Sequence, residues 1–276
     1  MVISDDYQHL KIEYPDDGVL LVTINRPEVG NRANARLHWE LGQIWLAVSS
    51  DPDTRVAVIT GAGDAFCGGG ELQKFLDQIN DFPKIAQLIK EAKDIVQNMA
   101  NCEKPIISAI NGMANGVGAA VGLSADISIA GENALISDGH IRMGIAAGDH
   151  GALIWPLKCG LAKSAYYLLS GDSLTGREAE RIGLVGKCVP DSEVLGAALE
   201  LAVNLASGPQ HAIRWTKRAL SHWLRVNMPI FESSLAFEML NFFDGDVLAA
   251  ATAAKAGRKP VFPSANPNSS KEVDSI

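Results

Sequence analysis

Short apolar runs divide the first two-thirds of the chain into strands. Leu10 to Tyr14 and Val19 to Asn25 flank an Asp-Asp-Gly turn, and this arrangement predicts a β-hairpin. Arg55 to Thr60 and Pro105 to Ile110 are continuous apolar runs, which indicate strands buried on both faces. Further strands are predicted at Ile127 to Ala130, Ala134 to Ile136 and Val185 to Val189.

Helical spacing of apolar residues separates these strands. Leu37, Leu41, Ile44 and Val48 recur three or four positions apart and predict a helix over Asn34 to Val48. From Ala162 onward the pattern is mainly helical, with a helix start at Thr175. The other expected helices are Ile85 to Met99, Gly116 to Leu123, Ser192 to Ala206, Pro209 to Trp223 and Met228 to Phe243.

The strands come mostly in pairs that are followed by a helix, and the last quarter of the chain is helical. This order predicts an α/β fold of stacked layers. We expect residues 1–206 to form the core with the active site, and 207–262 to form a helical assembly region. The Ser-, Asn- and Pro-rich tail at 263–276 is expected to be disordered.

Composition narrows the function classes. The 276 residues carry a formal net charge of -8 and no basic stripe, which argues against nucleic-acid binding. The four cysteines have no CxxC spacing, so neither zinc nor a disulfide framework is expected. The first nine residues are polar and acidic, and the apolar runs are too short for a membrane span. We therefore expect a cytoplasmic protein that acts on a small molecule.

Two glycine-rich loops each follow a buried strand. They run from Ala65 to Leu72 and from Asn111 to Ala119, and the second opens a helix. Two free backbone N–H groups from such loops could hold a carbonyl oxygen as it becomes an oxyanion. The alternative is that both loops are ordinary turns with close-packing glycines. The GxGxxxG spacing of the second loop does not match a dinucleotide site.

Ordered segments along nearly the whole chain resemble the crotonase superfamily of enoyl-CoA hydratases and isomerases. No single segment is specific, whereas their order and spacing together are. The matching segments are Asn25-Arg26-Pro27-Glu28, Val58-Ile59-Thr60-Gly61, Ala65-Phe66-Cys67-Gly68-Gly69, Lys104-Pro105 to Asn111-Gly112, Ser124-Ala125-Asp126-Ile127, Leu169-Ser170-Gly171, Ala179 to Val185 and Gly257 to Phe262.

The resemblance implies a crotonase-like spiral of ββα units with a C-terminal helical trimerisation region, in homotrimers or dimers of trimers. It implies an oxyanion hole from the backbone N–H groups of Gly70 and Val117, although most members have glycine at the second position. It also implies an acyl-CoA thioester as substrate, so that coenzyme A enters as part of the substrate and no other cofactor is expected. The implied substrate-binding residues are Ala33, Cys67, Gly69, Leu72, Met113 and Gly116.

The catalytic acids of the family are missing. Hydratases of the family carry two glutamates at positions that correspond here to Ala120 and His140. Two carboxylates position and activate the water that adds to a double bond. Their loss argues against ordinary enoyl-CoA hydration.

His140 and Asp149, nine residues apart, offer a different chemistry. If the intervening loop folds back, the carboxylate can orient the imidazole and stabilise its protonated form. The stretch is similar to that of oxocamphor hydrolase and related β-diketone hydrolases, in which such a pair activates water for carbon–carbon bond cleavage. That likeness also implies a role for Glu238. The alternative for His140 is a structural histidine, and no metal site is expected.

Three functions remain open at this stage. The first is an enolate reaction on an acyl-CoA thioester, with His140 and Asp149 replacing the two glutamates. The second is hydrolytic carbon–carbon cleavage of a β-diketone without coenzyme A. The third is a catalytically silent scaffold that acts through its assembly surface, which the missing glutamates suggest.

Overall fold

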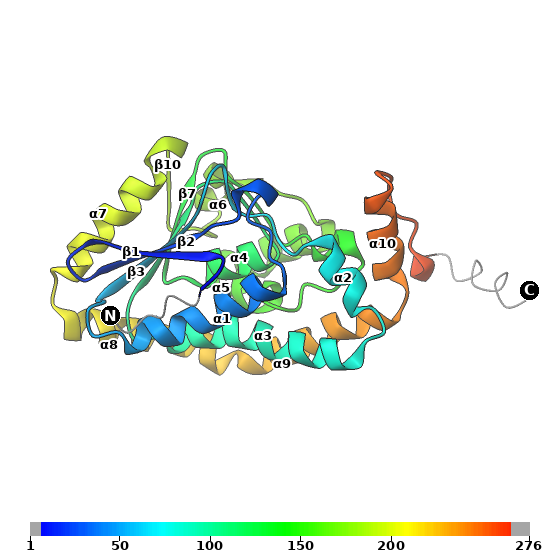
Figure 1. The fold of residues 1–276 in the computed structure, drawn as a ribbon, viewed down its shortest axis with the longest axis horizontal. Coiled ribbons are helices and arrows are strands. Elements are labelled where there is room, and N and C mark those ends of the chain that lie inside the picture. Colours follow the sequence, from blue (N-terminus) through cyan, green and yellow to red (C-terminus); the bar gives the residue numbers. More distant parts are fainter. Residues whose placement is uncertain (1–6, 266–276) are drawn as a thin grey trace, which may run out of the picture.

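The computed structural model describes residues 7–265, in which a large mixed sheet forms one layer (Figure 1). Its strand order is β1-β2-β3-β5-β7-β10. The predicted hairpin pairs β1 with β2 antiparallel, and the remaining neighbours are parallel. The strands are β1 (Leu10–Asp16), β2 (Val19–Ile24), β3 (Val56–Gly61), β5 (Ile106–Ile110), β7 (Ile127–Gly131) and β10 (Lys187–Val189).

A second, smaller sheet has the order β4-β6-β8-β9. Its strands are β4 (Ala65–Cys67), β6 (Met113–Asn115), β8 (Leu135–Ser137) and β9 (Leu174–Thr175). Each of the pairs β3/β4, β5/β6 and β7/β8 gives one strand to each sheet, and the chain advances by one parallel strand per pair. This is the spiral of ββα units that the sequence predicts.

Helices cover both sheets and extend beyond them (Figure 1). The early helices are confirmed, whereas the short α2 and the C-terminal α10 were not predicted. The helix expected from Ala162 begins eleven residues earlier and passes through a kink at Gly160, where φ is 75°. The helices are α1 (Ala35–Ser50), α2 (Leu72–Gln78), α3 (Phe82–Asn101), α4 (Val117–Ser124), α5 (Gly151–Ser170), α6 (Gly176–Arg181), α7 (Val194–Ala206), α8 (Gln210–Val226), α9 (Met228–Leu240) and α10 (Asp246–Lys255).

The large sheet buries both faces, which explains its continuous apolar strands. Val56 and Val58 of β3 belong to one core cluster with the apolar side of α7. Ala57 and Ile59 of the same strand belong to the other cluster, with α1, α3 and α4. Side chains along a strand point alternately to opposite faces, so every position of β3 is buried.

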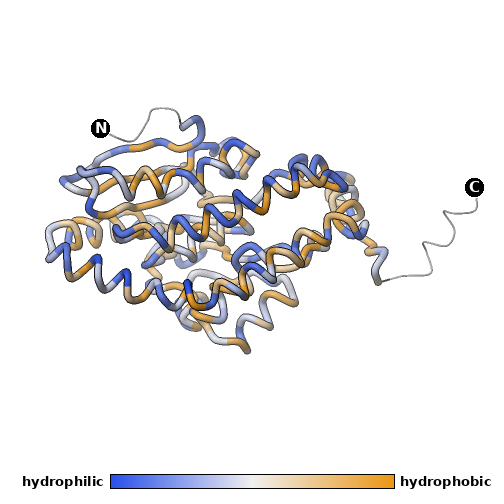
Figure 2. Tube along the Cα trace, turned by 90° about the horizontal axis from the view of Figure 1, so that it is seen from below, coloured by the Kyte–Doolittle hydropathy of each residue, from blue (hydrophilic) through white to orange (hydrophobic). Residues whose placement is uncertain are grey.

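The helical region after α7 reaches the far end of the molecule from β1, where α10 stands beside α2 (Figure 1). Hydrophobic and hydrophilic positions interleave along the helices (Figure 2), and large apolar side chains such as Trp215, Trp223 and Phe237 are exposed on α8 and α9. The predicted tail begins with an ordered 3-10 turn at Pro263–Ala265, and the rest of it lies outside the described residues.

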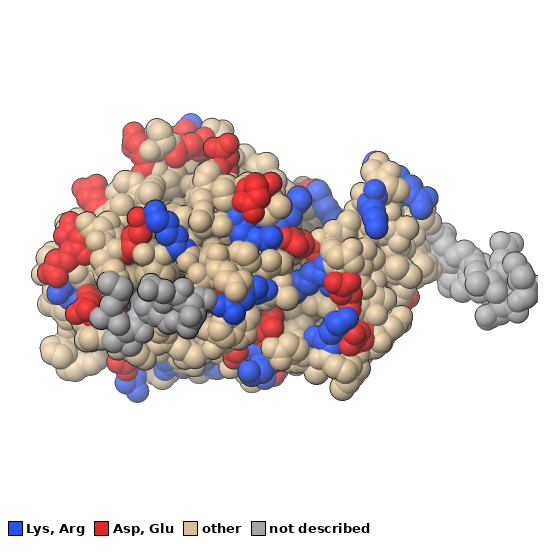
Figure 3. All heavy atoms as spheres, in the orientation of Figure 1, with Lys and Arg blue, Asp and Glu red and all other residues tan. Residues whose placement is uncertain are grey.

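On the face shown in Figure 3 the acidic and basic side chains are interspersed rather than sorted into a stripe. Among residues 7–265, every helix is too short or too polar to span a membrane.

Candidate active site

Three neighbouring parallel strands of the small sheet end at one edge. β4, β6 and β8 lie side by side, and their carboxyl ends lead directly into Gly68, Gly116 and Asp138. Parallel strands bring residues that follow them to the same edge of the sheet. The fold therefore gathers the two glycine-rich loops and the Asp138–His140 segment in one place.

Glycine permits the close contact between these loops. Gly69 and Gly116 have φ values of 93° and 50°, a region that side chains disfavour. A Cβ atom added at Gly69 would lie 2.9 Å from Nδ2 of Asn115, and one added at Gly118 would lie 2.2 Å from the carbonyl oxygen of Cys67. Residues with side chains at these positions would force the loops apart.

The two expected oxyanion-hole donors both line the cavity formed at this edge. Ala33 pairs with Gly70 through the carbonyl of Gly69 and the N–H of Glu71, which leaves the Gly70 N–H facing the other way. Val117 is the first residue of α4, so its N–H has no acceptor within the helix. Its side chain is buried against the cavity wall.

The loop before α5 is fastened to α9. Ser234 donates from its hydroxyl to the carbonyl oxygen of Gly148 over 2.8 Å, and Asn241 accepts from the N–H of Ala146 over 2.9 Å. A Cβ atom at Gly148 would lie 2.6 Å from Cβ of Glu238, so only glycine allows this approach. These contacts between the loop and α9 hold Asp149 and Glu238 near the carboxyl end of β8.

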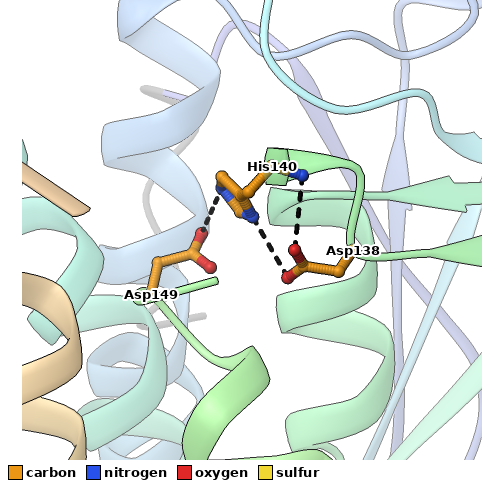
Figure 4. A group of neighbouring side chains, drawn as sticks. All are labelled: Asp138, His140 and Asp149. Carbon is orange, nitrogen blue, oxygen red and sulfur yellow. Dashed lines mark hydrogen bonds and ion pairs between the residues drawn. The ribbon is translucent and has the colours of Figure 1, made fainter. Parts of the chain in front are cut away.

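Two aspartates and two histidines form a closed, buried cluster in which acidic and basic side chains alternate (Figure 4 shows three of the four). Nδ1 of His140 lies 3.1 Å from Oδ1 of Asp138. Nε2 of His140 lies 3.8 Å from Oδ2 of Asp149. Nδ1 of His150 lies 2.5 Å from Oδ1 of Asp149, and its Nε2 lies 3.6 Å from Oδ1 of Asp138.

The predicted approach of Asp149 to His140 occurs, but the closer carboxylate is Asp138. A separation of 3.8 Å is too long for a direct hydrogen bond. Asp149 instead makes its short contact with His150, whereas Asp138 also accepts from the backbone N–H of His140 over 3.3 Å. Asp138 is therefore the carboxylate nearest to the imidazole, and Nε2 is the ring nitrogen that lies near Asp149 and Glu238.

Burial and the neighbouring charges shift the pKa values of this cluster in opposite directions. Burial disfavours a charged His140, yet the carboxylates of Asp138 and Asp149 outweigh it and raise the pKa of His140 well above 6.5. Burial and the nearby Asp149 charge raise the pKa of Glu238 well above 4.5. The pKa of Asp149 is lowered, since His140 and His150 more than offset its burial. The cluster thus favours the protonated forms of His140 and Glu238 and the ionised form of Asp149.

A cavity of about 380 Å³ opens over this cluster, a size that suits a small ligand. Of the sequence-predicted residues, the structure places Gly70, Leu72, Gly116, Val117, His140, Asp149 and Glu238 in its lining. Ala33, Cys67 and Gly69 lie behind the lining. Met113 is largely exposed and lines a separate hollow instead. Burial raises the pKa of the Cys67 thiol to about 11, so this cysteine packs rather than reacts.

Sequence reasoning missed four further contributors. Asp138 and His150 belong to the buried cluster around His140, and the sequence pattern assigns no role to either. Lys74 on α2 lines the cavity, as does His38 of α1, whose Nδ1 lies 2.7 Å from Oε2 of Glu91. His38 sits on the helical apolar stripe next to Leu37, and nothing in that pattern signals a cavity. Only the tertiary packing of α1, α2 and α3 reveals these residues.

One group of side chains in the described part of the chain is compact enough to hold a metal ion. Asp138, His140 and Asp149 each offer one ligand atom, and these atoms lie within 4.8 Å of one another. Two carboxylates and one imidazole suit a divalent metal in principle. The two aspartates approach different nitrogens of His140, Asp138 at Nδ1 and Asp149 at Nε2.

Comparison with known proteins gives a consistent result. The family model described as enoyl-CoA hydratase/isomerase matches residues 15–243. The (E)-benzylidenesuccinyl-CoA hydratase of Thauera aromatica is 35% identical over 223 residues, which cover 80% of this chain and 85% of the relative. A probable enoyl-CoA hydratase of Mycobacterium bovis is 30% identical over 262 residues, 91% of each chain.

Solved structures agree with this result. An enoyl-CoA hydratase/isomerase from Mycobacterium paratuberculosis superposes with a TM-score of 0.86 at 32% identity, covering 90% of this chain and 99% of the other. A β-diketone hydrolase from the cyanobacterium Anabaena, bound to (S)-3-oxocyclohexyl acetic acid, superposes with a TM-score of 0.79 at 30% identity. That match covers 86% of this chain and 95% of the other.

Proposed function

The chain belongs to the enoyl-CoA hydratase/isomerase family, and from this premise we propose that it hydrolyses a carbon–carbon bond of a β-dicarbonyl compound through an enolate. The observation that carries the proposal is the position of His140. Its Nε2 lies 3.8 Å from Asp149 and 3.9 Å from Glu238, at the floor of the cavity. A histidine with two carboxyl groups at this distance suits the activation of water.

The distances fit one shared water molecule. Two hydrogen bonds of about 2.8 Å that meet at roughly a right angle span about 4 Å. A water placed between Nε2 of His140 and the two carboxyl groups would satisfy both gaps. It would also bond the Glu238 oxygen Oε2, which has no hydrogen-bond partner among the described residues. Such a water would lie inside the cavity, next to His140.

Each side chain then has a defined task. His140 in its neutral form removes a proton from the water, while Asp138 holds the ring through Nδ1. The charge of Asp149 stabilises the imidazolium that results. The protonated Glu238 positions the water. Val117 and Gly70, whose N–H groups are free of acceptors in their loops, hold the oxygen that gains negative charge.

The atoms balance without a further reactant. The water oxygen bonds to one carbonyl carbon of the substrate, and the bond from that carbon to the central carbon breaks. The electron pair passes to the second carbonyl as an enolate, which the backbone N–H groups stabilise. His140 returns its proton to the central carbon. The products are a carboxylic acid and a ketone.

Two further points support this proposal. No carboxylate stands at Ala120 or at the position of His140, where hydratases of the family carry their paired glutamates. The Anabaena relative is a β-diketone hydrolase, and the molecule bound to it carries both a ketone and a carboxyl group. A cyclic β-diketone cleaved by water would give such a pair of groups.

The test is turnover of cyclic and bicyclic β-diketones by the purified chain. We expect loss of the enol absorbance together with release of one equivalent of acid, with no coenzyme A present. Absence of cleavage across the panel would contradict the proposal. A folded protein that turns over neither diketones nor enoyl-CoAs would instead support a silent scaffold.

A second candidate is an enolate reaction on an acyl-CoA thioester. It is favoured by the relatives of 30% identity and more, which are named for coenzyme A substrates, and by the two glycine-rich loops that this chain shares with them. Here His140 would act as the acid and base in isomerisation or another enolate step. Calorimetric binding of acetyl-CoA at micromolar concentration would favour this candidate over diketone hydrolysis.

We also propose that the chain assembles into trimers or pairs of trimers. The exposed Trp215, Trp223 and Phe237 on α8 and α9 support an apolar surface that another copy covers. Light scattering of the purified protein measures the mass directly. A monomer at micromolar concentration would contradict this proposal.

A further inference from the structure

Lys74 occupies an unusual position over the cavity. It lies on α2, which begins two residues after Gly70 and is pressed against the same loop. A Cβ atom at Gly70 would lie 2.9 Å from the ring of Phe75, and that ring stacks on Phe242 with centroids 6.4 Å apart. These contacts fix the helix that carries Lys74 beside one of the proposed oxyanion donors.

Within residues 7–265, the Lys74 ammonium group makes no hydrogen bond or ion pair. It lines both the main cavity and a neighbouring one of about 310 Å³. Burial lowers the pKa of Lys74 to about 8, against the opposing charges of Glu91, Asp149 and Glu238. A cation that faces a cavity without a partner is available for an anionic ligand.

We propose that Lys74 binds the carboxylate that hydrolysis creates, and before it the tetrahedral oxyanion on the same carbon. This inference rests on the proposed hydrolysis of a β-dicarbonyl compound. It gives the two substrate oxygens separate sites. The backbone N–H groups of Gly70 and Val117 hold the enolate oxygen, and the Lys74 side chain holds the oxygen of the attacked carbonyl.

Electrostatics favours this division. The attacked carbon must sit next to the water that His140 activates, and its carboxylate therefore forms close to Asp138 and Asp149. Those two side chains carry negative charge, and like charges in a buried site repel strongly. A cation is needed on the cavity side of the new carboxylate. Lys74 supplies it, because its side chain lines the same cavity as His140, Asp149 and Glu238.

An anionic oxygen at Lys74 could also come from a phosphate of coenzyme A. Both the product carboxylate and a coenzyme A phosphate offer an anionic oxygen. They differ in position, because the carboxylate would lie in the cavity and the phosphate would lie at the end of a long chain. Lys74 lines the cavity that also holds His140, Asp149 and Glu238. This favours the carboxylate, and the experiment below separates the two.

The experiment measures binding by calorimetry, which does not depend on turnover. The probes are cyclohexylacetate, its neutral amide, and coenzyme A. The proteins are the full-length wild type, Lys74→Met, Lys74→Arg and, as a matched control, Lys90→Met, which changes an exposed lysine of α3. Circular dichroism confirms that each variant is folded.

We expect Lys74→Met to weaken cyclohexylacetate binding by at least about tenfold and to leave the amide unchanged. Lys90→Met should match the wild type. Carboxylate binding to the wild type should weaken as the pH rises through about 8, because the ammonium then loses its proton. Lys74→Arg stays charged and should lose less affinity over the same range.

Two outcomes overturn the inference. The first is equal carboxylate affinity in wild type and Lys74→Met, and the second is a loss of affinity for coenzyme A alone. If the wild type cleaves β-diketones while Lys74→Met binds carboxylate normally, the proposed function stands and the role of Lys74 falls. If no diketone is cleaved, the proposed function fails whatever the binding data show.

Discussion

Nδ1 of His140 lies 3.1 Å from Oδ1 of Asp138, and the same aspartate accepts a hydrogen bond from the His140 backbone N–H. The aspartate thus fixes both the main chain and the ring of the histidine. The other ring nitrogen is left to face the cavity, Asp149 and Glu238. The chemistry of the site depends on this single orientation.

Replacement of His140 by alanine tests the central role. We expect kcat to fall by roughly two to four orders of magnitude, the usual loss when an acid–base group is removed. His222→Ala serves as the control because that side chain is exposed on α8, away from the cavity. Steady-state kinetics of diketone cleavage gives the numbers. Near-normal turnover by His140→Ala would show that another group activates the water.

Asp138→Asn tests the orienting contact. The carboxylate charge of Asp138 helps to raise the pKa of His140, so its removal should lower that pKa and move the alkaline rise in rate to lower pH. We also expect kcat to fall by about 10- to 100-fold because the ring loses its anchor. The pH profile of the variant is the measurement. An unshifted profile would mean that Asp149 alone sets the pKa.

Glu238→Gln and Glu238→Ala form a matched pair. Burial and the nearby Asp149 raise the pKa of Glu238, which favours the neutral carboxyl group, and an amide can imitate that form. We expect about a tenfold loss of kcat for glutamine and about a hundredfold loss for alanine. Equal losses in both variants would indicate that Glu238 transfers a proton instead of positioning water.

The dependence of rate and stability on pH follows from His140. Its pKa is raised well above 6.5, so the neutral base becomes abundant only on the alkaline side, and kcat/KM should rise with pH. Stability should move the other way. A raised pKa in the folded state stabilises the fold fully below about 6.5 and loses this contribution as pH rises through the folded-state pKa. Rate profiles and thermal melts across this range test both signs.

Removal of metal ions tests the compact group of Asp138, His140 and Asp149. Because these side chains pair as acid and base, dialysis against a chelator should leave turnover unchanged within about twofold. Added zinc should inhibit, since it would compete for His140 Nε2. Loss of activity on chelation that zinc or magnesium restores would contradict the metal-free mechanism.

The strand pattern and the glycine loops made most of the scaffold predictable, since their periods and spacings are local properties of the chain. His140, Asp149 and Glu238 were named because they fit a family pattern in order. That Asp138 lies closer to His140 than Asp149 does was not predictable, because the choice between two carboxylates depends on how a nine-residue loop folds. Lys74 was missed because α2 is short and its burial arises from packing against α3 and α10.

The three strand ends contribute different kinds of chemical group to the site. The proposed oxyanion donors are main-chain groups after β4 and β6, whereas the acid–base side chains come from β8 and the segments beyond it. A backbone N–H persists through almost any substitution, but a side chain changes with one codon. The scaffold can therefore exchange one proton-transfer chemistry for another while it keeps its way of binding an enolate. Under the proposed function, Ala120 and His140 in place of the two glutamates would be such an exchange, and a change of reaction would then need very few mutations.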